Sequence, residues 1–223
     1  AEVSQAVKKT PVCAVILPQM GMAPPLHLAV QDASGGSIVI EWEHGGVNVY
    51  ENPLGIMTNA PNFPYMLTNL RNYAGLNAEQ IAAKQYDGVR VVPTGHGAGM
   101  FGLPGDITPP SRFVRLAVLR QYADQASDAA GAVKLARHLL NTVYIPRGTV
   151  LDRNAAGDVT ASESTQWTAY YDVTNRQVYF QTYDNSTLRK IDMKVIDFES
   201  VTHNAITLSD ENETIIDVTK RMN

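Results

Sequence analysis

Short apolar runs alternate with turn-forming residues through the first quarter of the chain. Strand-length runs are predicted at Val12–Leu17, Pro25–Gln31, Ser37–Glu43, Val47–Tyr50 and Gly55–Thr58. Asp32–Gly36 separates the second run from the third, and its Asp, Ser and Gly residues are typical of a hairpin turn. Asn52-Pro53 is the turn signal between the last two runs. The pattern therefore predicts a meander of short antiparallel strands.

The middle of the chain changes to helical spacing. A helix is predicted over Phe63–Tyr73, because apolar residues recur every three or four positions there. Thr108-Pro109-Pro110 favours the start of a second helix, since Thr can cap it and proline needs no N–H in a first turn. We expect that helix to run to about Asp128 and a third to span Ala129–Asn141.

Strand patterns return near the end of the chain. They cover Gln166–Val173, Gln177–Tyr183 and Leu188–Met193. Strands, then helices, then strands is the order of an α+β protein, whereas a parallel sheet would show regular alternation. Because neither a repeat nor a clear linker interrupts the pattern, we expect residues 1–223 to form a single domain.

Composition and charge exclude several classes of protein. The 18 Lys and Arg residues are outnumbered by 22 Asp and Glu residues, so the net charge of −4 argues against nucleic acid as a partner. The longest apolar run, Val12–Leu17, is far shorter than the roughly 18 residues that a membrane-spanning helix needs. A single cysteine excludes an intrachain disulfide framework. The five histidines lack ligand spacing, so no metal site is predicted.

A glycine-rich segment matches a nucleotide-binding pattern only superficially. Gly97–Gly102 fits G-x-G-x-x-G and follows a short predicted strand, Val89–Val92. A dinucleotide site also needs a helix that begins within the glycines, and Pro104 and Pro109 prevent one. We therefore predict no cofactor, and glycines that permit a close-packed loop.

The nucleophile candidates in the sequence are weak. Cys13 lies in the first predicted strand between apolar neighbours, which favours a buried, inert thiol. A dyad with His27 is the alternative, although His27 on an apolar strand more often is a hydrogen-bonded core residue. The serine motifs G-x-S-x-G and S-x-x-K are both absent from the sequence.

Asn59 is the most informative polar residue. It follows the predicted strand Gly55–Thr58 and precedes a proline turn into a helix. An asparagine so placed can donate its side-chain N–H to a developing oxyanion, a contact that lowers a barrier by about 3–4 kcal/mol. It can equally cap or turn the chain, and that commoner role remains open on spacing alone.

Several segments, in the same order, resemble the choloylglycine hydrolase family, which includes bile salt hydrolases and penicillin V acylases. The resemblance is carried by Pro25–His27, Asp32–Glu41, Gly55–Pro61, Thr68–Tyr73, Gly102–Asp106, Ser111–Phe113 and Tyr183–Asn185. It implies an N-terminal-nucleophile hydrolase with an αββα sandwich, in which two antiparallel sheets lie between helix layers. The sandwich would be incomplete in this chain alone.

The resemblance also implies a mechanism and a substrate class. In the family a first-residue cysteine attacks a linear amide, and its own α-amino group is the base. Asn59 would then lie in the oxyanion hole, and Arg112 would orient and electrostatically support the nucleophile. Conjugated bile acids, penicillin V and N-acyl homoserine lactones are the small-molecule amide substrates implied, and a homo-oligomer, often a homotetramer, is the implied assembly.

The sequence departs from the family at its start. Ala1 has no nucleophilic side chain, and Cys13 matches a strand position rather than the nucleophile. We therefore expect this chain to be the C-terminal part of an enzyme whose cysteine lies on a missing N-terminal segment or second chain. The alternative is a non-catalytic binding or assembly fragment. Glu41-Trp42 and Asn69–Tyr73 are similar to Gram-negative members, which favours a periplasmic location.

Overall fold

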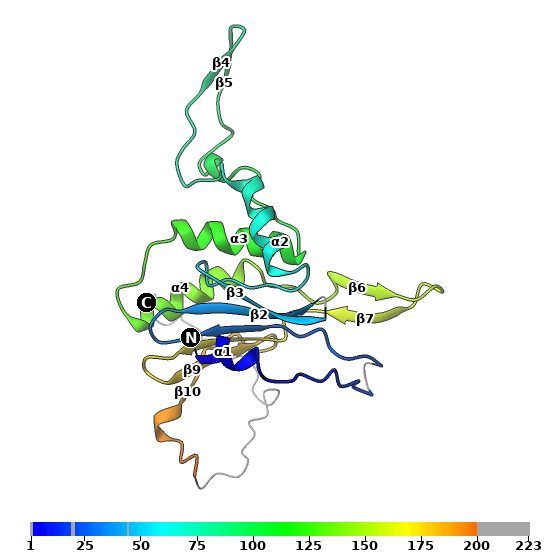
Figure 1. The fold of residues 1–223 in the computed structure, drawn as a ribbon. Helices are drawn as coiled ribbons and strands as arrows, with labels where there is room; N and C mark the ends of the chain where they lie inside the picture. The colour runs from blue at the N-terminus through cyan, green and yellow to red at the C-terminus, as the bar shows by residue number, and fades with distance from the viewer. Residues whose placement is uncertain (1, 19–20, 44, 200–223) are drawn as a thin grey trace, which may run out of the picture. The chain divides into compact units, whose positions relative to one another are not determined.

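The computed structural model describes residues 2–18, 21–43 and 45–199 (Figure 1). The chain forms two compact units, one ending at Ala123 and the next beginning at Asp124. The single domain predicted for residues 1–223 stays a prediction.

The first unit is built on a three-stranded antiparallel sheet. Its strands are β1 (Leu28–Gln31), β2 (Ser37–Glu43) and β3 (Gly46–Glu51), in the order β1-β2-β3. The predicted hairpin turn is confirmed, and Asp32 Oδ1 accepts the backbone N–H groups of Ser34 and Gly36. Val39 and Ile40 are both fully buried in the central strand. Because adjacent residues point to opposite faces, both faces of β2 are covered.

Two helices cover one face of this sheet. They are α2 (Phe63–Leu70), which continues as the 3₁₀ turn η1 (Arg71–Tyr73), and α3 (Pro109–Tyr122). Phe63, Met66 and Phe113 pack with Val39 and Ile56 in the core, and the Phe63 and Phe113 rings meet edge to face. The helix start predicted at Thr108 is confirmed, although α3 ends at Tyr122 because Ala123 is extended.

The first unit also contains shorter elements. Helix α1 (Glu2–Val7) opens the chain, and the hairpin of β4 (Lys84–Tyr86) and β5 (Val89–Val91) projects away from α2 and α3 (Figure 1). The hairpin leads to the 3₁₀ turn η2 (Ala98–Met100).

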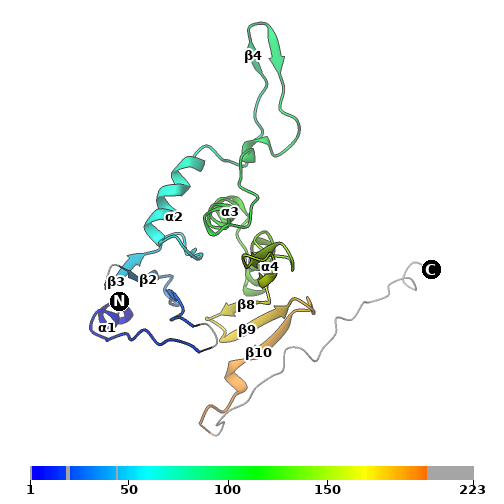
Figure 2. The same cartoon turned by 90° about the vertical axis from the view of Figure 1, so that its right-hand side faces the viewer.

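The second unit places a helix on a second antiparallel sheet. Helix α4 (Ala129–Asn141), capped by Asp128, lies against β8 (Trp167–Asp172), as Figure 2 shows. The sheet has the order β10-β9-β8, with β9 at Gln177–Thr182 and β10 at Arg189–Asp192. The remaining elements are the hairpin β6 (Val150–Arg153) and β7 (Val159–Glu163) and the turn η3 (Met193–Val195). The three predicted strands and the predicted helix of this unit are confirmed.

Two predicted strands are wrong. Val12–Leu17 has one isolated bridge, from Leu17 to Met22, and Val12, Val15 and Ile16 are exposed. Gly55–Thr58 forms no strand because the Asn52 side chain bonds both the N–H and the carbonyl of Ile56. The sequence reasoning also missed β4, β6 and β7, which are short and mostly exposed.

Candidate active site

The two residues predicted to be catalytic lie in direct contact. Asn59 is exposed in the loop between β3 and α2, and Arg112 is half-buried in the first turn of α3. Arg112 Nη2 donates to Asn59 Oδ1 at 2.7 Å, while Arg112 Nε donates to the Ile107 carbonyl at 3.0 Å. A guanidinium only donates hydrogen bonds, so it must face the oxygen of the Asn59 amide. The Asn59 N–H₂ group is therefore turned away from Arg112.

A carboxylate organises the start of α3 and with it Arg112. Asp106 accepts hydrogen bonds from the Thr108 N–H at 2.9 Å and from the Ser111 hydroxyl at 2.6 Å. The Thr108 hydroxyl also donates to Asp106 instead of capping the helix itself. These hydrogen bonds lower the pKa of Asp106 to about 2, and the bond from Ser111 has the largest effect. From the sequence, Asp106 was named only as the end of the Gly102–Asp106 segment and was assigned no role.

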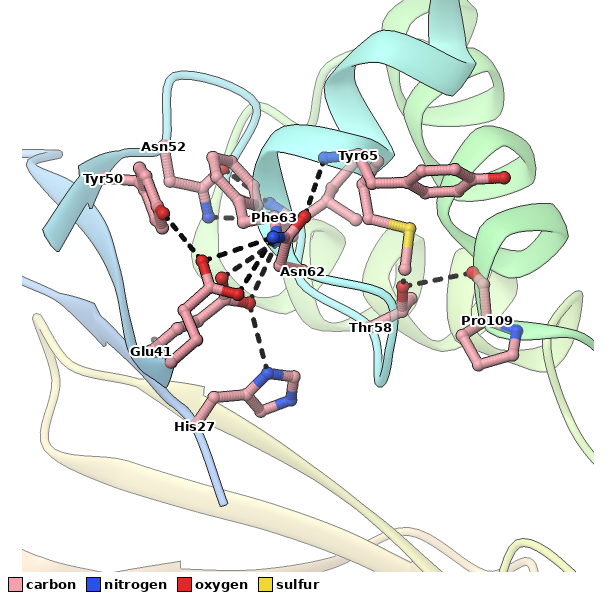
Figure 3. Close-up of polar contacts among 12 residues, drawn as sticks. His27, Glu41, Tyr50, Asn52, Thr58, Asn62, Phe63, Tyr65 and Pro109 are labelled. Atoms are coloured by element: carbon pink, nitrogen blue, oxygen red, sulfur yellow. Dashed lines mark hydrogen bonds and ion pairs between the residues drawn. The ribbon is translucent and has the colours of Figure 1, made fainter. Parts of the chain in front are cut away.

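Two further carboxylates, on β2, hold the start of α2 (Figure 3). Glu41 accepts the Phe63 N–H with both oxygens, at 3.0 and 3.1 Å. Glu43 accepts the Asn62 side-chain N–H₂ at 2.9 Å, and Asn62 Oδ1 in turn accepts the Tyr65 N–H. Asn62 is thus the cap of α2.

Asn59 lines a pocket of about 300 Å³ in the first unit. Its other lining residues come from the segment before β1, from β2 and from the loop before α2: Pro25, Leu26, His27, Glu41, Trp42, Glu43, Ala60, Pro61 and Asn62. The pocket therefore combines an amide donor and two carboxylates with apolar surface. Such a mixture can orient a small molecule that is partly apolar.

His27 and Cys13, the alternative candidates for a nucleophilic dyad, lie in different environments. His27 is half-buried, with Nδ1 3.5 Å from Glu41 Oε1, so a polar partner is confirmed although the residue lies at the pocket and not in the core. The expectation that Cys13 is buried is wrong: its thiol is free and exposed. The reason is that residues 11–16 lie outside the strands of the sheet. Cys13 is not among the residues that line the pocket with His27.

The glycine-rich loop is close-packed, as predicted. A Cβ at Gly99 would lie under 3.0 Å from the carbonyl oxygens of Asn77 and Glu79. Gly97 and Gly102 have positive φ, and η2 lasts a single turn.

Two kinds of feature, a metal-ion cluster and a membrane-spanning helix, concern residues 2–18, 21–43 and 45–199. Within them no group of three or more His, Cys, Asp and Glu side chains lies close enough to share a metal ion. No helix in these ranges has the length and apolar character needed to cross a bilayer. His44 and His203, two of the five histidines, lie outside the described residues.

This α+β chain, with an asparagine amide oriented by an arginine, corresponds to a known class of proteins. The family described as linear amide C–N hydrolases, choloylglycine hydrolase family, matches residues 1–216. The chain belongs to this family.

Relatives with described activities are similar over most of the chain. A bile salt hydrolase/transferase of Clostridium perfringens is 32% identical over 86% of this chain and 57% of its own length. A conjugated bile acid hydrolase of Lactobacillus acidophilus is 32% identical over 85% of this chain and 58% of its own length. The chain thus spans less than two thirds of these relatives.

Solved structures confirm the fold class. A variant of the conjugated bile acid hydrolase from Clostridium perfringens has a TM-score of 0.79 at 29% identity, over 97% of this chain and 64% of that structure. Penicillin V acylase from Agrobacterium tumefaciens has a TM-score of 0.65 at 21% identity, over 88% of this chain and 52% of that structure, a likeness of fold alone. The expected α+β fold of the N-terminal-nucleophile hydrolases is thereby confirmed.

Proposed function

We propose that the complete protein containing this chain hydrolyses a linear amide, with a conjugated bile acid as the favoured substrate. The observation that carries the proposal is the 2.7 Å hydrogen bond from Arg112 Nη2 to Asn59 Oδ1, which orients the Asn59 amide. The names of the relatives support the substrate class. Penicillin V and N-acyl homoserine lactones are the other linear amides to compare.

The proposed reaction uses Asn59 for charge stabilisation. A cysteine thiolate attacks the amide carbon, and the carbonyl oxygen becomes an oxyanion that accepts an N–H of Asn59. The C–N bond then breaks, the amine leaves with a proton, and water hydrolyses the thioester to release the acid. Arg112 holds the amide so that little reorganisation is needed when the charge develops.

We propose that the attacking cysteine comes from outside these 223 residues, on a preceding segment or a second polypeptide. The pocket beside Asn59 is lined by no thiol within the part of the chain that the structure describes. An α-amino group with a pKa of about 8 on that cysteine would accept the thiol proton near neutral pH.

A homo-oligomer is part of the same proposal, and the β4–β5 hairpin supports it. Tyr86, Val89 and Val91 on the hairpin are exposed, and Phe101 beside it is 87% exposed. Large apolar side chains gathered on a projecting arm are typical of an interface. A second copy of the chain is the proposed partner, and sedimentation velocity should show a species larger than one protomer.

The test begins with the composition of an active preparation. Intact mass and N-terminal sequencing should identify a polypeptide that begins with Cys, and the preparation should release the amine from a conjugated bile acid. Replacing Asn59 by Ala should reduce turnover about 10²–10³-fold, the usual loss for one oxyanion donor. The matched control Asn72→Ala, at an exposed asparagine after α2, should keep full turnover.

Three results would contradict the proposal. Normal turnover by Asn59→Ala would remove Asn59 from the mechanism. Hydrolysis by a preparation without an N-terminal cysteine would require another nucleophile. A stable protein that hydrolyses none of the three amides would favour a binding or assembly module.

A further inference from the structure

Glu41 is a buried carboxylate in the central strand β2. Only 6% of its surface is exposed, and it points to the same face of β2 as the fully buried Val39. Burying a carboxylate is costly unless hydrogen bonds compensate it. Its compensating partners are the N–H of Phe63, at the start of α2, and His27 Nδ1 at 3.5 Å. The partial positive charge of a helix N-terminus also favours a carboxylate there.

The neighbouring Glu43 strengthens the same attachment. It holds the side chain of Asn62 and accepts the Tyr50 hydroxyl at 3.0 Å. Burial first, and the hydrogen bond to Glu43 second, raise the pKa of the Tyr50 hydroxyl above its usual value. Two successive residues, Asn62 and Phe63, are therefore bound to one face of β2 (Figure 3).

The loop that carries Asn59 is short and held at both ends. Before it, the hydroxyl of the buried Thr58 donates to the Pro109 carbonyl at 3.1 Å. After it, Glu41 and Glu43 hold Phe63 and Asn62. A movement of the first turn of α2 would therefore be transmitted to Asn59 within a few residues.

We propose that Glu41 is a positioning residue for the oxyanion donor: it holds the first turn of α2 on β2 and thereby fixes the place of the Asn59 amide. The inference rests on the proposed role of Asn59. An oxyanion donor works at 2.7–3.1 Å from the developing charge, and a displacement of about 1 Å can cost 10²-fold in rate. In this proposal Glu41 acts because its side chain is long enough to bring a carboxylate oxygen to the Phe63 N–H. It does not contact a reacting atom itself.

Three substitutions in the complete enzyme separate the effect of side-chain length at position 41 from the effect of its charge. Glu41→Gln keeps a carbonyl acceptor at the same distance but removes the charge. Glu41→Asp keeps the charge but withdraws the acceptor by one methylene. Glu41→Leu removes both. If side-chain length matters more than charge, kcat should be highest for Glu41→Gln, lower for Glu41→Asp and lowest for Glu41→Leu. We expect kcat to fall about 10–100-fold for Glu41→Leu, and KM to stay within about 3-fold of wild type.

The readout must distinguish positioning from folding. Active sites are counted by the burst of amine release that accompanies formation of the acyl-enzyme, and kcat is expressed per counted site. Positioning lowers kcat per site, whereas a purely structural role lowers the number of sites and leaves kcat per site unchanged. The latter result, or a higher kcat for Asp than for Gln, would overturn the proposal. Glu51→Leu, at an exposed glutamate ending β3, is the matched control and should behave as wild type.

A double-mutant cycle tests whether Glu41 acts through Asn59. In an Asn59→Ala background, Glu41→Gln and Glu41→Asp should change kcat per site by less than about 2-fold, because the donor they position is gone. Losses that multiply with that of Asn59→Ala would overturn the inference while leaving the proposed function intact. Full turnover by Asn59→Ala alone would instead overturn the proposed role of Asn59, whereas a wild-type protein that hydrolyses no linear amide would overturn the proposed function. The Gln and Asp variants keep a polar group of similar size, so the cycle does not depend on the folding of Glu41→Leu.

Discussion

Arg112 Nη2 lies 2.7 Å from Asn59 Oδ1, although the two residues are 53 positions apart in the chain. This contact fixes which way the Asn59 side-chain amide points. Its oxygen faces the guanidinium, and its N–H₂ group, which is turned away from Arg112, is the proposed oxyanion donor. Because Arg112 also donates to the Ile107 carbonyl, the guanidinium is held at two points.

Replacing Asn59 by Asp should separate stability from activity. A carboxylate at position 59 would form an ion pair with Arg112, so we expect the melting temperature to stay constant or rise. It has no N–H, and its negative charge would repel the oxyanion. Turnover should therefore fall by at least the roughly 10²–10³-fold expected for Asn59→Ala. Thermal unfolding and steady-state kinetics on the complete enzyme measure the two effects.

The comparison with Asn59→Ala decides the interpretation. If Asn59→Asp were more active than Asn59→Ala, Asn59 would act through its oxygen or its charge and not through its N–H. An equal loss of stability in both variants would show that the ion pair with Arg112 does not form.

Arg112→Lys should impair catalysis while keeping the positive charge. One ammonium group on a flexible stem cannot reproduce the fixed, planar contacts of Arg112 with both Asn59 and Ile107. Losing a hydrogen bond from a charged group costs about 1.5–3 kcal/mol, which corresponds to a fall in kcat of roughly 10–100-fold. Steady-state kinetics check this, with Arg120→Lys at the exposed end of α3 as the control. Unchanged kcat for Arg112→Lys would reduce its role to that of a charge.

Local sequence patterns predicted the elements that local interactions form. The Asp32–Gly36 turn, β2 and α4 follow from turn residues, alternation and helical spacing, and all are present. The failures occurred where a side chain competes with the backbone pattern. Asn52 satisfies both backbone groups of Ile56, so Gly55–Thr58 does not pair as a strand although its composition favours one.

The candidate site was predictable in part. Asn59 was a candidate oxyanion donor from its position in the sequence, and the resemblance then favoured that role and added Arg112. Their contact depends on the packing of α2 against α3. Glu41 was missed, although alternation along β2 places it on the inward face with Val39, which is a detectable signal for a buried acid. Cys13 was mispredicted because apolar neighbours were assumed to be buried, and they are exposed.

Asp106 should make stability depend on acid pH. Its pKa falls from 3.8 to about 2 in the folded protein, mainly through the Ser111 hydroxyl. A lowered pKa adds stability that is fully present above about pH 4 and is lost as the pH falls through about 2. Asp106→Asn should therefore reduce the urea midpoint at pH 7, and the difference from wild type should shrink between pH 4 and pH 2. Asp152→Asn, at an exposed aspartate on β6, is the matched control and should leave the urea midpoint at pH 7 unchanged.

Gly99→Ala should destabilise the first unit because the new Cβ has no space. It would meet the backbone carbonyl oxygens of Asn77 and Glu79, while the Gly99 carbonyl accepts the Asn77 N–H at 3.0 Å. Two backbone segments would have to separate, and overpacking of this kind costs about 1–3 kcal/mol of unfolding free energy. Gly95→Ala is the matched control, since a Cβ there meets nothing within 4 Å. Urea unfolding of both variants measures the difference, and equal midpoints would show that the loop opens without cost to accept a side chain.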